Sequence, residues 1–388
     1  ILVKGDPRYG FSQIIDLLEA KQHMTVMEVD LNALSHNFKF FKSHINPSTK
    51  TVGMVKASGY GAGSYEIAKT LQDCGCDYLA VAVHDEGVDL RKASITMPII
   101  VLNPNGVNYK AMFQYRLEPE LYSIEMARDL IKEGGKYGVT GFPVHIKIDS
   151  GMHRLGFRIE QLPDLTQLLL SQNIITPVSI FSHLSVAEDP TQDEYTREQF
   201  SYFDQCYDLF QRSFNHSIMR HILNTSGIVR FPERQYDMVR IGIGLYGIRT
   251  LFDGSEDTLM PVSALRSIII SIKQWPGGTA IGYGRRGVLQ RDSRIATVNI
   301  GYADGFDRHF GNGRVSMWVG GKLCPTVGNV CMDAVMIDVT DVNCKVGDTV
   351  EIFGEHVPVE QLSEARGTIP YEILTSVAPR VKRVYYRE

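Results

Sequence analysis

The sequence predicts an α/β fold in two parts, a set of parallel β/α units followed by a mainly antiparallel β domain. Its 388 residues exceed the usual size of a single domain. Between about residues 25 and 261, short apolar runs alternate with longer amphipathic stretches, and from 262 to 388 strands alternate with tight turns. About eight units suit a closed (β/α)8 TIM barrel, with a doubly wound open sheet as the alternative that the pattern leaves open.

The expected strands of the first part are short apolar runs with helical patterns between them. Helical periodicity is clear over 31–42, 64–74 and 123–134. Because strands and helices alternate, we expect parallel strands joined by crossover helices. The strands are expected over 27–31, 52–55, 78–83, 98–102, 144–148, 178–181, 221–223 and 239–245.

The second part has the pattern of an antiparallel β domain. Turn residues recur at Gly277-Gly278, Gly320-Gly321 and Gly347-Asp348, and the boundary is expected near Met260-Pro261. The strands are expected over 264–275, 294–300, 314–319, 334–339 and 349–353.

Composition is that of an ordinary soluble globular protein, with 44% hydrophobic and 22% charged residues. A net charge of -4 argues against a nucleic-acid surface. No apolar run approaches the roughly 20 residues of a membrane span, and no signal-peptide pattern is seen, so we expect a cytoplasmic protein without membrane contact. The six cysteines show no metal-ligand spacing, so we expect reduced thiols and no metal site.

Lys56 is the principal candidate for catalysis. It follows the apolar run Thr51–Val55 and precedes a segment containing Gly59, Gly61 and Gly63. Strand ends and the loops after them hold the chemistry of α/β enzymes. A partly desolvated amine there can form a Schiff base with an aldehyde, whereas the alternative is a surface lysine at a strand end.

A wider set of motifs resembles the alanine racemase family in the same order along residues 25–385. The segment Met54-Val-Lys-Ala-Ser-Gly-Tyr-Gly-Ala-Gly63 is similar to the family's pyridoxal 5′-phosphate (PLP) attachment motif, with Ala62 where the family usually has histidine. The resemblance favours the barrel over the open sheet. The other motifs are Val144–Phe157, Phe181–Leu184, Leu223–Gly227, Met238–Gly247, Ile281–Gly284, Ile300–Gly305, Gly328–Asp333 and Pro370–Ile373.

This resemblance implies a two-base racemase that interconverts L- and D-alanine and supplies D-alanine for peptidoglycan. PLP would be bound to Lys56, whose amine then serves one face of the α-carbon. Tyr283 would be the second base, given by the other subunit of a homodimer with shared active sites. Since a phenol has a pKa near 10, neighbouring donors would have to stabilise its anion.

The resemblance also implies the remaining cofactor contacts. Arg240 would face the pyridine nitrogen of PLP and donate a hydrogen bond without giving up its proton. His183 would join Arg240 in a line toward Tyr283. The phosphate would be held by the hydroxyls of Tyr60, Thr225 (serine in most relatives) and Tyr371, and by backbone groups of Gly242 and Ile243. From the residues alone, His183 could instead be a core histidine, Arg240 part of a salt bridge and Tyr371 a packing residue.

Substrate contacts follow from the same resemblance. Arg154 would bind the cofactor's phenolic oxygen and the substrate carboxylate, Met332 would offer its backbone amide, and Tyr302 together with Tyr371 would narrow the entrance for a small side chain. Lys147 would be carbamylated to orient Arg154; the alternative is an unmodified lysine paired with Asp149.

Other functions stay open. A serine or broad-range racemase shares the same motifs. A non-catalytic PLP-binding protein of the single-barrel type lacks a β domain, and a decarboxylase of the same architecture is disfavoured by Arg240.

The first 24 residues are expected to be a remnant of an upstream domain or linker. Ile1–Gly5 and the amphipathic stretch Phe11–Ala20 resemble the C-terminus of a UDP-N-acetylmuramoyl-tripeptide–D-alanyl-D-alanine ligase. The resemblance implies that the chain is the racemase part of a fusion with such a ligase.

Overall fold

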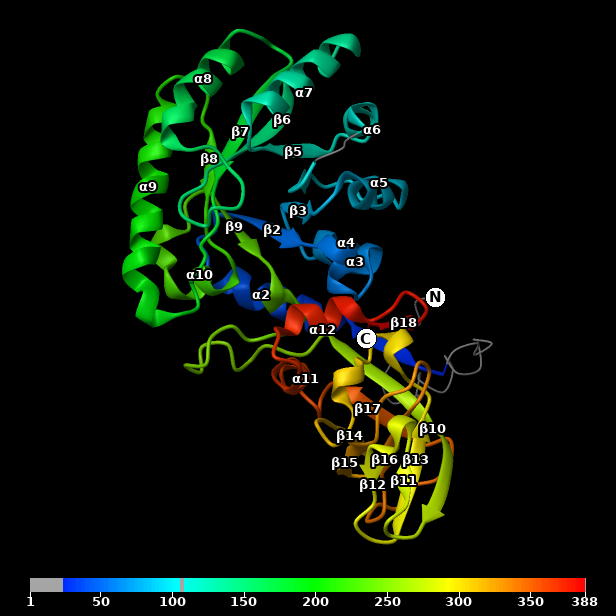
Figure 1. The fold of residues 1–388 in the computed structure, drawn as a ribbon. Helices are drawn as coiled ribbons and strands as arrows, with labels where there is room; N and C mark the ends of the chain where they lie inside the picture. Colours follow the sequence, from blue (N-terminus) through cyan, green and yellow to red (C-terminus); the bar gives the residue numbers. More distant parts are fainter. Residues whose placement is uncertain (1–23, 105–107, 388) are drawn as a thin grey trace. The chain divides into compact units, whose positions relative to one another are not determined.

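The structure, a computed structural model, describes residues 24–104 and 108–387, which form two compact units. The barrel unit comprises residues 34–59 and 64–260 (Figure 1). Residues 24–33, the short segment 60–63 and residues 261–387 form the second group, which we call the β unit. The expected ligase-like segment over 1–20 lies outside the described residues.

Eight parallel strands make the barrel. Strands β2 to β8 neighbour one another in chain order, and β9 pairs with β2. The ring closes where the N–H of Arg240 donates to the carbonyl of Leu223 at 3.1 Å and Asp237 donates to Arg220 at 3.1 Å. An open, doubly wound sheet is therefore wrong. The strands are β2 (Lys50–Met54), β3 (Tyr78–Val81), β4 (Ile99–Val101), β5 (Glu118–Leu121), β6 (Phe142–Lys147), β7 (Ile175–Phe181), β8 (Met219–His221) and β9 (Met238–Ile241).

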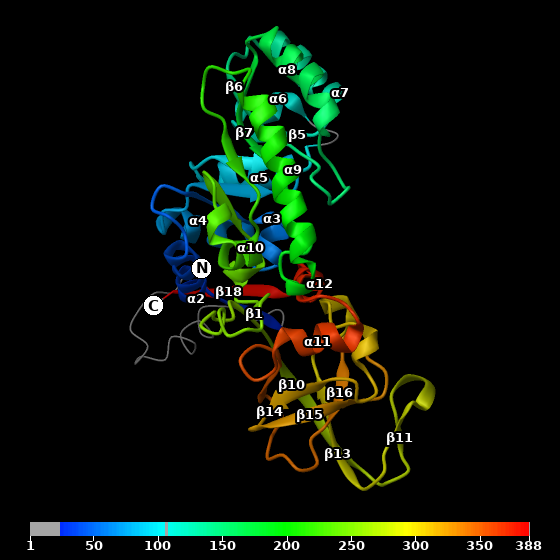
Figure 2. The same cartoon turned by 90° about the vertical axis from the view of Figure 1, so that its left-hand side faces the viewer.

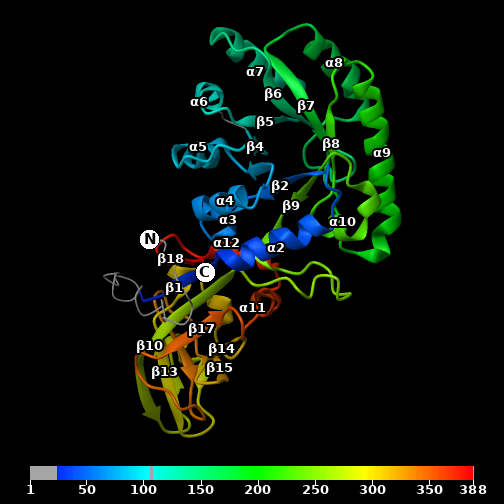
Figure 3. The same cartoon turned by 180° about the vertical axis from the view of Figure 1, so that it is seen from behind.

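Helices lie on the outside of the barrel (Figure 3). Each presents an apolar stripe to the strands; in α4, Ile67, Ala68 and Leu71 are buried at the spacing of one helix face. Ser123 and Asn224 cap two of them, accepting from Met126 N and Gly227 N. The helices are α2 (Leu31–Ser43), α4 (Ser64–Asp73), α5 (His84–Lys92), α6 (Tyr109–Gln114), α7 (Ile124–Lys136), α8 (Leu162–Leu170), α9 (Asp193–Gln211) and α10 (Thr225–Arg230).

The first expected barrel strand forms, but in the other unit. Strand β1 (Val26–Asp30) pairs antiparallel with β10 and parallel with β18, so its assignment to the barrel was wrong. Its burial alternates residue by residue, with Met27 and Val29 buried, as in a strand with one covered face, whereas a barrel strand such as β4 is buried throughout. The true remaining barrel strand, β5, was missed because its sequence, Glu-Pro-Glu-Leu, is polar and contains proline.

Antiparallel strands form the β unit (Figure 2), apart from the parallel β1–β18 pair. The order is β13-β16-β15-β14-β17-β10-β1-β18, and β13 also pairs with β10, so six strands form a closed ring. The five expected strands are present as β10 (Ser263–Trp275), β13 (Ser293–Val298), β14 (Ser316–Val319), β16 (Val335–Asp338) and β17 (Thr349–Phe353). Elements not anticipated are β11 (Ala280–Ile281), β12 (Gly287–Val288), β15 (Lys322–Val327), β18 (Lys382–Tyr386), α11 (Val359–Arg366) and α12 (Pro370–Ser376).

Candidate active site

Lys56 stands at the carboxyl end of β2, where the chain makes a left-handed turn, α3 (Lys56–Tyr60). Ala57, Ser58 and Gly59 have φ values of 52°, 53° and 60°. Non-glycine residues lose roughly 1–2 kcal/mol each in this conformation, so the surroundings must impose it. Glu86 does so in part, because one of its carboxylate oxygens accepts from Ser58 N at 3.3 Å while the other accepts from Ala82 N at 2.8 Å. The turn holds Lys56 in one place relative to β2.

The amine of Lys56 has a lowered pKa. Burial is the main cause, the cation of Arg154 adds to it, and Glu86 opposes it. A larger neutral fraction makes the amine a better nucleophile toward a carbonyl and a better base. The environment of Lys56 is thus unlike that of an exposed lysine at a strand end.

Arg240, on β9, is buried and held by neutral groups. Its Nη1 donates to Nδ1 of His221 at 2.8 Å. Its Nη2 lies within donating distance of the Ser182 carbonyl, the Ile222 carbonyl and Nδ1 of His183, at 2.6, 3.1 and 3.1 Å. No ion pair to Arg240 occurs in the described residues, so the expected alternative of a salt bridge was wrong. Burial lowers the pKa of Arg240 to about 10, with Glu120 opposing, so the guanidinium stays charged at neutral pH.

His183 is a neutral acceptor. Burial, followed by the charges of Arg240 and other cations, holds its pKa well below the usual value. Because arginine can only donate, Nδ1 of His183 carries the lone pair and Nε2 the proton. His183 is therefore joined to Arg240, as the resemblance implied.

Lys147 is the last residue of β6, and its charge interacts with that of Glu120 on β5. Its amine lies 4.4 Å from the ring centroid of Phe181. Burial lowers the pKa of Lys147 and raises that of Glu120, and each opposes the shift of the other. The Asp149 carboxylate instead accepts from Gly151 N at 3.1 Å and lies 3.2 Å from Nδ1 of His153. In the described residues it forms no ion pair with Lys147.

Thr225 and Gly242, both predicted to bind the phosphate, come together although they follow different strands, β8 and β9. Gly242 N donates to Oγ1 of Thr225 at 2.9 Å, and Thr225 opens α10. Ile243 begins a short 3₁₀ turn directly after Gly242. Space is tight, since a Cβ on Gly244 would lie 2.4 Å from Phe41 and 2.7 Å from Thr225.

The barrel end is rich in positive charge. The charges of Lys56, Lys147, Arg154 and Arg240 all act on His183, whereas Glu120 is the one carboxylate that raises the pKa of Arg240. This set of donors suits a ligand with a phosphate and a phenolate, and therefore fits PLP.

In the β unit, Tyr60 and Tyr371 lie side by side with ring centroids 5.9 Å apart. Burial, reinforced by Tyr371, raises the pKa of Tyr60, so its phenol stays protonated and can donate. The segment after Tyr60 is tied to β18, since Arg383 Nε donates to the Gly61 carbonyl at 2.9 Å.

Tyr283 is highly exposed, at 70%. It sits in a turn between Gly282 and Gly284, which both have positive φ, and its carbonyl accepts from Asn329 Nδ2 at 2.9 Å. Tyr302 and Met332 are also exposed and adjacent, because Tyr302 N donates to Cys331 O and Ala303 N to Met332 O. Within residues 24–104 and 108–387, the exposed tyrosine is therefore held through its backbone, without a side-chain hydrogen bond.

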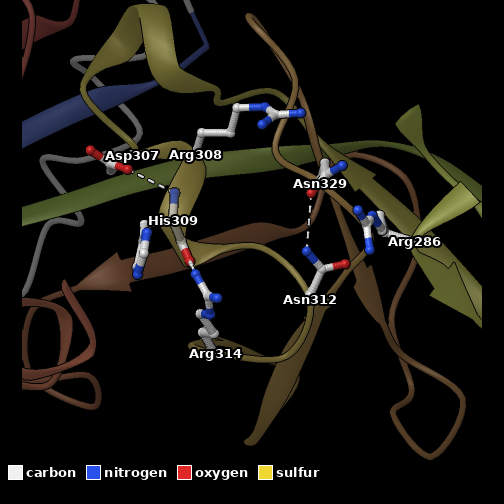
Figure 4. Close-up of a pocket in the computed structure, with 7 residues that line it drawn as sticks. All are labelled: Arg286, Asp307, Arg308, His309, Asn312, Arg314 and Asn329. Atoms are coloured by element: carbon white, nitrogen blue, oxygen red, sulfur yellow. Dashed lines mark hydrogen bonds between the residues drawn. The ribbon is translucent and has the colours of Figure 1, made fainter. Parts of the chain in front are cut away.

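A polar cavity of about 660 Å³ adjoins the turn of Tyr283 (Figure 4). Asn329, which holds the Tyr283 carbonyl, also accepts from Asn312 Nδ2 at 3.0 Å in the cavity wall. Asp307 pairs with Arg366 at 3.2 Å, which leaves the arginines of the wall as its dominant charge. The lining residues are Arg286, Asp307, Arg308, His309, Asn312, Arg314 and Asn329, none of which was anticipated.

Sequence reasoning also missed Glu86, Glu120 and His221. Each occupies a barrel strand or the helix after one, next to a residue that was named. No local signal distinguished them, because Glu86 lies in a helix and the strands of Glu120 and His221, Glu-Pro-Glu-Leu and Met-Arg-His, are not apolar runs.

All six cysteines lie in the described residues and are free thiols, as expected. No helix of the described chain combines the length and the apolar character required to cross a membrane.

Comparison with known proteins gives one consistent family. The Alanine racemase, N-terminal domain family matches residues 29–250, and the Alanine racemase, C-terminal domain family matches residues 262–385. The chain is 35% identical to alanine racemase 2 of Oceanobacillus iheyensis over 96% of both proteins. It is 36% identical to alanine racemase of Thermodesulfovibrio yellowstonii, over 93% of this chain and 97% of that protein.

Solved structures agree. Alanine racemase of Clostridium difficile 630 superposes with a TM-score of 0.88 at 34% identity, covering 93% of this chain and 95% of that one. Alanine racemase of Bacillus anthracis with bound L-Ala-P gives 0.87 at 29% identity, with coverage of 95% and 96%.

Proposed function

The chain belongs to the alanine racemase family and is an isomerase that interconverts L- and D-alanine, and we propose that it does so with PLP and two bases, Lys56 and Tyr283. The observation that carries the proposal is the setting of Lys56, a desolvated amine at a strand end among cations. When bound, PLP supplies an electron-accepting ring that stabilises the charge left by removal of the α-proton.

Lys56 has two tasks in this proposal. Its amine would hold the cofactor covalently, and when free of the cofactor it would take or return the α-proton on one face. The lowered pKa supports both tasks, because each requires a neutral amine near neutral pH.

Arg240 would donate to the pyridine nitrogen of PLP. Its two described anchors on histidine Nδ1 atoms, at 2.8 and 3.1 Å, support a fixed guanidinium that keeps its proton. A donor of this kind leaves the ring nitrogen unprotonated, which disfavours proton return at the wrong carbon. This disfavours the decarboxylase alternative.

The phosphate of PLP would be bound by hydroxyls and backbone amides. Thr225, Gly242 and Ile243 would serve from the barrel unit, and Tyr60 and Tyr371 from the β unit. Support comes from the contact of Gly242 N with Thr225 and from the pairing of the two tyrosine rings. His183 would complete the cofactor site beside Arg240.

Tyr283 would act from a second copy of the chain, in a homodimer with shared active sites. Its high exposure supports this, since a catalytic phenol needs a covered site that its own turn does not supply. Tyr302 and Met332, exposed in the same unit, would join it there, Met332 through its backbone amide. The second copy would thus complete the site around alanine.

Arg154 would bind the substrate carboxylate and the cofactor's phenolic oxygen. Lys147 would be carbamylated, which requires a neutral amine; its lowered pKa supports that state. The resulting anion would offset part of the positive charge around Arg154 and orient it.

We further propose a biological setting that depends on the family alone. The enzyme would work in the cytoplasm and supply D-alanine for peptidoglycan. The PLP-binding domain predicted over 25–261 keeps these bounds except for β1 and residues 60–63, which belong with the β domain predicted over 262–388. The fusion with a ligase-like domain before residue 25 stays a prediction. An intact mass of the native gene product near 43.5 kDa, the mass of this chain, would contradict it.

One experiment tests the function and the site together. PLP-loaded enzyme is reduced with borohydride and mapped by mass spectrometry, and α-proton exchange in D₂O is followed with L-alanine, D-alanine and serine. We expect the label on Lys56, fast exchange with both alanine enantiomers and slow exchange with serine. A label on another lysine would refute the site, and faster exchange with serine would favour the broad-range alternative.

A further inference from the structure

A line of buried polar side chains crosses five neighbouring strands of the barrel. One residue comes from each of the strands β5 to β9, and only the last has a role in the proposed mechanism. Three of the five are at most 1% exposed, and the first has a side chain that is 14% exposed. They are Glu118, His145, Ser179, His221 and Arg240.

Each member is within hydrogen-bond distance of the next. Arg240 Nη1 lies 2.8 Å from His221 Nδ1, and His221 Nε2 lies 3.2 Å from Ser179 Oγ. Ser179 Oγ lies 2.6 Å from His145 Nδ1, and His145 Nε2 lies 2.9 Å from Glu118 Oε2. The line is therefore continuous from the cofactor end of the barrel to the first residue of β5.

The two ends set the direction of the bonds nearest to them. Arginine only donates, so His221 accepts at Nδ1, carries its proton on Nε2 and donates to Ser179. Glu118, as a carboxylate, only accepts, so His145 donates to it from Nε2. Ser179 Oγ, which accepts from His221, can donate its own hydrogen to His145 Nδ1, 2.6 Å away, and no two protons then meet.

Packing keeps the line in place. His145 and Ser179 are register partners in the β6–β7 pairing. The ring of His221 stacks on Phe181, with centroids 4.8 Å apart and planes inclined by 5°. Away from water, such bonds strengthen one another, and a broken link leaves a buried polar group unpaired.

We infer that Ser179 is a positioning residue for Arg240, with Glu118 as the remote anchor of the same line. Ser179 fixes the ring of His221 so that its Nδ1 lone pair faces Arg240 Nη1. This inference rests on the proposed function, in which Arg240 faces the pyridine nitrogen of PLP. Without the line, Arg240 loses a fixed acceptor and becomes less well oriented for the cofactor.

The first test determines the tautomers by NMR of the full-length protein with ¹⁵N-labelled histidine, the signals being assigned with single histidine variants. We expect His221 to be neutral, with its proton on Nε2, and we expect His145 to carry a proton on the Nε2 that faces Glu118. A proton on Nδ1 of His221 in the native protein would overturn the proposed line.

The second test breaks the line at its centre. Ser179→Ala should move the Nδ1 signal of His221 away from the unprotonated position and weaken PLP binding about tenfold, as expected for loss of one buried hydrogen bond in a charged network. Ser179→Thr, which keeps the hydroxyl, should restore both. Thr196→Ala is the matched control, since Thr196 is equally buried and donates to the Gln192 carbonyl outside the line.

A double-mutant cycle tests the remote anchor. If Glu118 and Ser179 act through one line, Glu118→Ala combined with Ser179→Ala should weaken PLP binding by clearly less than the product of the two single effects. Fully multiplicative effects would overturn the role of Glu118, as would a Ser179→Ala protein no different from Thr196→Ala. If the His221 signal moves in Ser179→Ala but PLP affinity does not, the hydrogen-bond line stands and the proposed place of Arg240 at the cofactor fails.

Discussion

The guanidinium of Arg240 donates to Nδ1 of His183 across 3.1 Å, and burial beside four cations holds the pKa of this histidine well below its ordinary value. A buried histidine is thereby kept neutral as an acceptor. The free energy of unfolding therefore depends on pH, because His183 has a depressed pKa in the folded protein and its ordinary pKa in the unfolded chain.

As the pH is lowered, the free energy of unfolding should decrease more steeply in the wild type than in His183→Asn. The folded pKa of His183 lies below the unfolded value of about 6.5, so its contribution is full above that pH and is lost as the pH falls below it. Removing the histidine should reduce the slope of the free energy of unfolding by up to about 1.4 kcal/mol per pH unit between pH 6 and 5. Urea unfolding at several pH values measures this, and identical slopes would count against a depressed pKa.

Ala57→Gly should stabilise the protein by about 1 kcal/mol, since Ala57 is exposed and has a φ of 52° that glycine adopts without strain. Ala68→Gly, in the right-handed helix α4, is the control for backbone conformation and should lower the free energy of unfolding by about 1 kcal/mol or more, since the methyl group of Ala68 is also buried. Urea unfolding of both variants measures the difference. Loss of stability in both would show that the left-handed turn is unstrained.

Gly244→Ala should lower the free energy of unfolding by about 2 kcal/mol or more, because its Cβ would lie 2.4 Å from the buried ring of Phe41 and 2.7 Å from Thr225. PLP affinity should fall as Thr225 is displaced. Gly135→Ala in α7 is the control, since its Cβ would meet only Ile174 at 3.5 Å, and it should be neutral or stabilising. Equal effects of the two substitutions on unfolding would contradict the tight packing.

Arg240→Lys should weaken PLP binding and lower the free energy of unfolding by about 2–4 kcal/mol. Lysine keeps the charge but lacks the planar fork that reaches both His221 and His183, so buried acceptors lose their donors. Calorimetric titration with PLP and urea unfolding measure the two effects. Arg158→Lys, at an exposed arginine, should change neither.

Mixing inactive Lys56→Ala and Tyr283→Phe proteins should restore part of the activity if sites are shared between subunits. In a heterodimer one site would then receive both bases intact, which predicts up to about a quarter to a half of wild-type activity per heterodimer. Native mass spectrometry must verify heterodimers before the assay. Verified heterodimers without activity would show that each site draws both bases from one chain.

The residues by themselves determined most of the succession of strands and helices, because apolar period and turn residues are local properties. Lys56 at a strand end was visible in this way, whereas Thr225, Tyr283 and the other candidate site residues followed from the resemblance of ordered motifs to a family. The contact of Gly242 N with Thr225 was not predicted and came from the structure.

Only the tertiary structure decided which sheet each strand joins and which polar groups meet. Strand β1 looks apolar locally but pairs with β10 and β18, and β5 looks polar yet closes the barrel and supplies Glu118 and Glu120. The line from Glu118 to Arg240 joins residues up to 122 positions apart through cross-strand geometry, which no local pattern encodes. Burial then sets the protonation of Lys56, His183 and Arg240, since desolvation depends on everything packed around them.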